Sequence, residues 1–267
     1  MNTRFSTFAC CFAIFFLSIS AHAETSIPSI IGENMVLQRN QPIVIWGWDE
    51  AGQKVDVSVA GHSAQATTDS DGQWIVSLEK LAAGGPHTIA IKGSSELSLK
   101  NVLVGEVWLC SGQSNMEWTV SRSDNAQQEI ASSTHPSIRH IKFPHRPSAK
   151  PEDNIMSSGW QESEPKTVGA FTAVGYFFAR HLQVELDIPI GLIGSNWGGT
   201  RIEPWTSPSG FKSVPALKSI ADNLADFPAV NPKGQVNHQS ALALYNGMIH
   251  NFRHFNFQGA IWYQGES

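Results

Sequence analysis

Three short polar segments of the sequence carry residue types that can perform nucleophilic chemistry, and each directly follows a predicted strand. Ser114 lies in a tight turn, where its hydroxyl can be exposed and its own N–H can bind an oxyanion. Gly198 and Gly199 allow close approach of a ligand and leave N–H groups to face it. The side-chain amide of Gln264 can donate to the same charge. Ordinary turn or capping chemistry explains each segment alone, whereas the three together favour a nucleophile beside an oxyanion site.

The elements that must position these segments alternate between strand and helix. Apolar runs predict strands at residues 107–110, 188–193 and 259–263, and helical spacing of apolar residues predicts helices near 170–182 and 240–251. This order predicts right-handed crossovers and a parallel α/β sheet. Ligands bind such sheets outside the carboxyl ends of the strands, which is where the polar segments stand. We predict a long irregular stretch over residues 121–165.

The N-terminal part has a different pattern. Between residues 27 and 103, short alternating runs are separated by turn residues, and the predicted strands are 42–48, 54–60, 73–78, 87–92 and 96–103. Val55, Val57 and Val59 share one face of their strand. The regular spacing predicts an antiparallel β-sandwich over residues 24–103, followed by the α/β domain over residues 104–267.

Residues 1–23 have the pattern of a secretory signal peptide. Arg4 precedes a mostly apolar stretch at residues 8–19, and Ala21-His22-Ala23 forms a small-x-small cleavage site. We therefore expect cleavage after Ala23 and a secreted or periplasmic protein, with no membrane association afterwards. Cys110 is then the one remaining cysteine, so an intrachain disulfide is impossible, and we interpret it as a buried packing residue.

The composition narrows the function further. Only 15% of the 267 residues are charged and the net charge is -5, which argues against a disordered tail, a coiled coil and a nucleic-acid partner. The 22 glycines and 9 tryptophans fit a loop-rich fold that contains β-structure.

Six blocks of the sequence resemble the sialate O-acetylesterases, a family of the SGNH/GDSL hydrolase superfamily. They are residues 35–39, 44–48, 103–110, 111–118, 198–205 and 261–267. The resemblance covers essentially the whole mature chain. It implies an SGNH-type (flavodoxin-like) hydrolase domain, no metal or organic cofactor, and O-acetylated sialic acid as substrate. It also implies that Ser114 attacks the acetyl carbonyl, with the oxyanion bound by the N–H groups of Ser114 and Gly199 and by the Gln264 amide.

Three further residues are candidates for substrate binding. Arg201 can pair with the sialate carboxylate through its planar guanidinium, although an ion pair with Glu203 explains it equally well. Trp118 and Trp205 flank the predicted site, and aromatic faces suit sugar rings. Core packing is the alternative for both tryptophans.

One departure from the family pattern concerns the general base. In this family the base is a histidine within Asp-x-x-His, and none of the ten histidines here stands three positions after an aspartate. His238 lies in a loop that can approach the site, whereas His250 and His254 are interpreted as structural or surface residues. We therefore expect a chain that stops before the base-bearing loop and leaves a sheet edge open.

For residues 24–267 alone, we expect only weak hydrolysis of an activated acetyl ester. Two alternatives remain at this point. One is an esterase for acetylated xylan or another acetylated glycan, and the other is a non-catalytic glycan-binding protein that keeps the cleft without the base.

Overall fold

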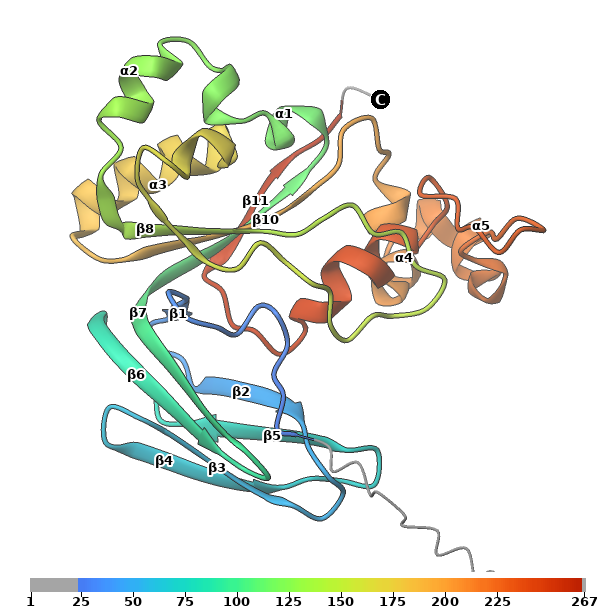
Figure 1. Ribbon diagram of the computed structural model, residues 1–267. Helices are drawn as coiled ribbons and strands as arrows, with labels where there is room; N and C mark the ends of the chain where they lie inside the picture. The colour runs from blue at the N-terminus through green and yellow to red at the C-terminus, as the bar shows by residue number, and fades with distance from the viewer. Residues whose placement is uncertain (1–23, 266–267) are drawn as a thin grey trace, which may run out of the picture.

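One long strand, β7 (Glu96–Gly112), joins the two parts of the molecule in the computed structural model, which describes residues 24–265 (Figure 1). Its first half pairs antiparallel with β6 (Gly84–Lys92), and its second half pairs in parallel with β10 (Ile190–Asn196) and β11 (Gly259–Tyr263). The strand therefore crosses residues 103 and 104 without a break. The predicted signal peptide at residues 1–23 lies outside the described residues.

The N-terminal part is the predicted sandwich of two layers, whose strands are antiparallel apart from one short parallel pair. One layer has the order β4 (His62–Thr67), β3 (Lys54–Val59), β6 and β7, with β1 (Val36–Gln38) beside β7. The other layer pairs β2 (Ile43–Trp48) with β5 (Gln73–Leu78). Val55, Val57 and Val59 are all buried, as their alternation predicts. The sequence pattern missed β1, which is short, and β4, which has small and polar residues and lies at the edge of its layer.

The second part contains the predicted parallel sheet, in the order β11, β7, β10, β8 (His135–Lys142) and β9 (Gln161–Ser163), with β9 antiparallel to β8. The expectation of an irregular stretch over residues 121–165 is wrong, because it holds α2 (Ala126–Ala131), β8 and β9. Polar residues conceal β8 in the sequence. Its Arg139 and His140 are buried, and the Arg139 guanidinium is paired with Glu162 at 3.2 Å.

One of the two predicted helices is present, and short helical turns replace the other. α3 (Ala173–Leu186) packs on β10 and β8, as its spacing predicts. The predicted helix at 240–251 is instead a π-helical turn, Tyr245–Ile249, and a 3₁₀ turn, His250–Phe252. A Cβ at Gly247 would lie 1.7 Å from the carbonyl oxygen of Arg146, so this segment packs directly against backbone. The remaining short helices are α1 (Ser114–Glu117), α4 (Pro208–Ser213) and α5 (Lys218–Ala221). The other 3₁₀ turns are Val120–Arg122, Val168–Ala170, Glu203–Trp205, Pro215–Leu217 and Leu224–Asp226. Within residues 24–265, every helix falls short of the length and apolarity that a membrane crossing needs.

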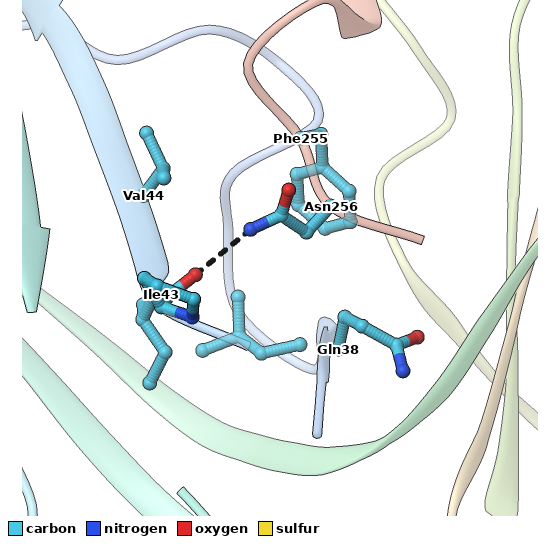
Figure 2. Close-up of a pocket in the computed structure, with 7 residues that line it drawn as sticks. Gln38, Ile43, Val44, Phe255 and Asn256 are labelled. Atoms are coloured by element: carbon cyan, nitrogen blue, oxygen red, sulfur yellow. Dashed lines mark hydrogen bonds between the residues drawn. The ribbon is translucent and has the colours of Figure 1, made fainter. Parts of the chain in front are cut away.

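A polar seam joins the sandwich to the α/β part. The buried Gln38 accepts from the N–H of Val107 at 2.9 Å and donates to Gln258 at 3.0 Å. The Asn256 amide donates to the carbonyl of Pro42 at 2.8 Å, the bond dashed in Figure 2. The cavity at this seam measures only about 10 Å³. It is at the lower limit for one water molecule, so we interpret the seam as packing and not as a ligand site.

Cys110 is the packing residue that the sequence predicts. Its side chain is fully buried and free of disulfide bonds, and burial raises the pKa of the thiol to about 12. The thiolate is the reactive form of cysteine, so this group is inert near neutral pH.

His140 makes the stability of the fold depend on pH. Burial, together with the nearby charge of Lys142, lowers the pKa of its imidazole to about 3, and the ring stacks on Phe171 at 4.5 Å. The unfolded chain binds this proton more readily, so the contribution is complete above about pH 6.5 and is lost as the pH falls toward 3.

We expect His140→Phe to remove this dependence while it retains a ring on Phe171. Between pH 3 and 6.5, the slope of the free energy of unfolding against pH falls by up to about 1.4 kcal/mol per pH unit. Urea unfolding of both proteins across this range measures the slopes. Identical slopes would contradict the assignment of the buried, neutral imidazole.

Candidate active site

The three polar segments meet at the carboxyl ends of three adjacent parallel strands. In the sheet register, Gly112 at the end of β7 lies opposite Asn196 of β10 and Tyr263 of β11. The N–H of Trp197 donates to the carbonyl of Gly112 at 3.0 Å, and the N–H of Gln113 donates to that of Tyr263 at 2.9 Å. Two backbone hydrogen bonds therefore tie the turn that carries Ser114 between the other two segments.

Gly112 permits this close approach. Its φ is +127°, and a Cβ there would lie 2.1 Å from the carbonyl oxygen of Tyr263. The chain then enters α1, whose Met116 is completely buried and anchors the helix. The carbonyl of Met116 also accepts the hydroxyl of Thr172 at 2.6 Å. Ser114, at the start of α1, is left exposed.

The two glycines of the second segment differ in what their N–H groups do. The N–H of Gly198 donates to the Glu117 carboxylate at 2.8 Å, whereas the N–H of Gly199 donates to no atom among the described residues. Gly199 adopts φ +73°, and its carbonyl accepts the side-chain amide of Gln239 at 2.8 Å. A Cβ at Gly198 would lie 3.3 Å from the Cβ of Ser114, so the turn packs directly against Ser114. Gly199 is therefore the member of the pair with an N–H available to a ligand.

Gln264 lies at the same rim, but its amide is already engaged. Its Nε2 donates to the carbonyl of Thr200 at 2.5 Å and to Oε1 of Gln113 at 3.0 Å, which uses both hydrogens. These contacts correct the expectation of a free oxyanion donor, because the protein's own carbonyl groups compete for the amide. In this structure Gln264 instead holds the second segment against the first.

A hollow of about 430 Å³ opens beside Gln264. It is lined by Arg201, Ile202, Glu203, Gln264 and Gly265. Arg201 is exposed, and its guanidinium makes no ion pair with any residue in the described range 24–265. The alternative, an ion pair between Arg201 and Glu203, is therefore absent there, and Arg201 lines the hollow as an exposed cation.

The two candidate tryptophans differ in exposure. Trp205 is only 5% exposed, packs with Leu244 and Met248, and donates to the Thr200 hydroxyl at 3.0 Å. A ring so buried offers no face to a sugar, so core packing is the correct interpretation. Trp118 is 41% exposed, and the guanidinium of Arg122 lies 3.9 Å from its ring centroid.

A charged cluster beside Ser114 was not predicted from the sequence. Oε1 of Glu117 lies 2.6 Å from Nε2 of His145 and 3.9 Å from the ammonium of Lys142. The ammonium also donates to the buried side chain of Asn196, and burial lowers the pKa of Lys142. Lys142 ends β8 and His145 follows it, so the failure to recognise β8 concealed both. The parallel pairing of β8 with β10 places both residues near Ser114, and this pairing is not visible in the local sequence pattern.

Four of the histidines fall into two groups by their contacts. His238 stacks on Trp197 at 4.6 Å between ring centroids, and His145 stacks on Trp197 at 4.3 Å. His250 instead lies 3.7 Å from Asp153, and His254 packs edge-on against Trp46. These last two contacts agree with the structural role predicted for His250 and His254. Within residues 24–265 no three His, Cys, Asp or Glu side chains gather as a metal site.

The family model and the curated relatives that match this chain are all described as sialic acid acetylesterases. Residues 104–267 match the family described as carbohydrate esterase, sialic acid-specific acetylesterase. Sialate O-acetylesterases of Homo sapiens and Mus musculus are 34% and 31% identical over 264 and 292 residues. These alignments cover 90% and 94% of this chain, and 48% and 53% of those proteins.

A solved structure agrees with these matches. The crystal structure of a carbohydrate acetylesterase from Xanthomonas citri superposes with a TM-score of 0.80 at 36% identity, covering 91% of this chain and 52% of that chain. The chain thus spans about half the length of the relatives it matches.

Proposed function

The chain belongs to the sialic acid-specific acetylesterase family of carbohydrate esterases, and we propose that it removes O-acetyl groups from sialic acid with Ser114 as the nucleophile. The observation that carries the proposal is the exposed Ser114 packed against the 198–199 turn, whose Gly199 N–H is available. A hydroxyl beside free backbone N–H groups is the arrangement that acyl transfer requires.

In the proposed reaction, Oγ of Ser114 attacks the acetyl carbonyl carbon while a base removes the hydroxyl proton. The N–H groups of Ser114 and Gly199 bind the resulting oxyanion. When the oxyanion collapses, the bond between the acetyl carbon and the sugar oxygen breaks. The sugar oxygen takes the proton from the base, and an acetyl-serine remains. Water then attacks this ester, and acetate and free Ser114 are formed. The Asp-x-x-His motif that supplies the base in the family is absent from residues 1–267. Within these residues His238 is the candidate to test first, since its ring stacks on Trp197, which directly precedes the glycine pair.

Arg201 supports sialic acid as the substrate class. Its guanidinium borders the hollow next to Gln264 and lacks an ion pair within the described residues, so it can bind the sialate carboxylate through two parallel hydrogen bonds. Xylan has no such carboxylate on its acetylated backbone sugar. An exposed cation therefore favours the acidic sugar over the neutral one.

Release of acetate by the protein made from its complete coding sequence tests this proposal. We expect faster release from O-acetylated sialic acid than from acetylated xylan. We also expect Arg201→Gln to raise KM for the sialate about tenfold or more, because the two charge-assisted hydrogen bonds to the carboxylate are lost. Hydrolysis of p-nitrophenyl acetate, which has no carboxylate, is the internal control. A preference for xylan would overturn the substrate class, and glycan binding without acetate release would overturn the enzymatic role.

A further inference from the structure

Glu117 stands one helical turn after Ser114 on α1 and connects three separate segments. Its Oε2 accepts the N–H of Gly198 at 2.8 Å, and its Oε1 lies 2.6 Å from Nε2 of His145. Lys142 provides a positive charge 3.9 Å from the same carboxylate. The carboxylate is thus held by two other side chains while it binds the turn next to the nucleophile.

The contact with Gly198 fixes the orientation of the following peptide. Consecutive N–H groups in a turn are related by the backbone dihedral angles, so holding the Gly198 N–H constrains where the Gly199 N–H points. The turn also touches Ser114 itself, since a Cβ on Gly198 would lie 3.3 Å from the Cβ and 3.4 Å from the Cα of Ser114. A small displacement of this turn would therefore move the oxyanion donor relative to the attacking oxygen.

Among the described residues, the acceptor of the Gly198 N–H is Glu117, while other contacts hold the residues on either side. Trp197 is fixed through its N–H to Gly112, and its ring lies between those of His145 and His238. The carbonyl of Gly199 is held by Gln239. Between these two anchors, the Gly198 N–H is bound by the Glu117 carboxylate, and the carbonyl of the same peptide, that of Trp197, accepts the Thr200 hydroxyl at 2.8 Å. Both oxygens of Glu117 are engaged, so it is not placed to exchange protons with a substrate.

We propose that Glu117 is a positioning residue that couples α1 to the 198–199 turn and so aligns the Gly199 N–H with the oxyanion formed at Ser114. Lys142 and His145 hold the carboxylate in this place. This inference rests on the proposed esterase function. It adds Glu117 as a residue that acts through the Gly199 N–H and does not itself contact the acetyl ester. Preorganised donors of this kind stabilise the transition state more than the bound substrate.

The experiment compares Glu117→Ala and Glu117→Gln with wild type in the protein made from its complete coding sequence. For p-nitrophenyl acetate, we expect Glu117→Ala to lower kcat by about 10- to 100-fold with KM changed less than about threefold, because the donor matters only in the transition state. Glu117→Gln keeps an oxygen that can accept the Gly198 N–H. It should therefore recover kcat to within about tenfold of wild type.

Hydrogen exchange of the backbone amides supplies a readout that does not depend on catalysis. In Glu117→Ala, exchange should accelerate in the peptide that contains Gly198 and remain unchanged in the sandwich strands. Glu152→Ala is the matched control, since the Glu152 and Glu117 side chains are both 30% exposed and Glu152 is ion-paired to Arg146 at 3.3 Å. It should alter neither kcat nor exchange at Gly198.

Three results would overturn the inference. They are unchanged kcat in Glu117→Ala, lowered kcat without faster exchange at Gly198, and faster exchange throughout the protein. If wild type itself shows no esterase activity, the proposed function fails. In that case the exchange measurement still decides whether Glu117 holds the turn.

Discussion

Replacing Ser114 with alanine should lower kcat/KM for acetyl ester hydrolysis by about 10³-fold or more. The substitution removes the oxygen that forms the acyl-enzyme, and the N–H groups of residues 114 and 199 remain to polarise the carbonyl. In serine hydrolases, such remaining groups leave a residual rate about 10³–10⁴-fold above that in water, which is far below the rate of the intact enzyme. The measurement is acetate release by the wild-type and variant proteins made from the complete coding sequence.

The fold should tolerate this change. Ser114 is exposed and Met116, which anchors α1, is untouched, so we expect the free energy of unfolding to move by about 0.5 kcal/mol or less. Ser219→Ala is the matched control, because Ser219 is an exposed serine on the short helix α5. It should leave both activity and stability unchanged. Activity of Ser114→Ala within tenfold of wild type would exclude Ser114 as the nucleophile.

Replacing Gly112 with alanine should damage both the fold and the site. The added Cβ would lie 2.1 Å from the carbonyl oxygen of Tyr263 and 2.9 Å from its nitrogen, so the backbone of β11 must move. The residue would also be strained at φ +127°. We expect a loss of stability of about 3 kcal/mol or more, which corresponds to roughly 6–12 °C in Tm. Displacement of the rim should lower kcat about 10²-fold.

A substitution at a second glycine separates the effect of the steric clash with Tyr263 from the effect of backbone strain at positive φ. Gly61, in the turn between β3 and β4, also has positive φ, at +83°, but a Cβ there would meet nothing within 4 Å. Gly61→Ala should therefore cost only about 1–2 kcal/mol of backbone strain and leave kcat unchanged. Thermal unfolding and acetate release distinguish the two variants. Equal destabilisation by both would show that the contact between Gly112 and Tyr263 is not a close one.

The sandwich illustrates which features could be predicted from local patterns. The alternation of Val55, Val57 and Val59 identifies β3, because a half-buried strand buries every second residue. The alternation of apolar and polar residues did not identify the polar strand β8. Its buried Arg139 and His140 are compensated by ion pairing and ring stacking with residues far along the chain, which no local pattern records.

The same contrast applies to the aromatic and amide side chains of the site. Trp118 and Trp205 have similar sequence contexts beside polar turns, yet one is exposed and the other is buried against Leu244 and Met248. Gln264 was correctly expected at the rim, but its hydrogen-bond partners Thr200 and Gln113 come from two other segments. Local sequence specifies a donor without specifying which acceptor it meets.

Strand periodicity and glycine turns are local properties, so the amino-acid sequence predicts β7, β10 and β11 and the three polar segments that follow them. Which acceptor each donor meets depends instead on the three-dimensional packing. It committed the Gly198 N–H to Glu117 and both hydrogens of the Gln264 amide to the protein, and it left the Gly199 N–H available. It also brought Lys142 and His145 to Glu117. These outcomes depend on contacts between residues far apart in the chain, which form only when β8, β10, β7 and β11 pair in one sheet.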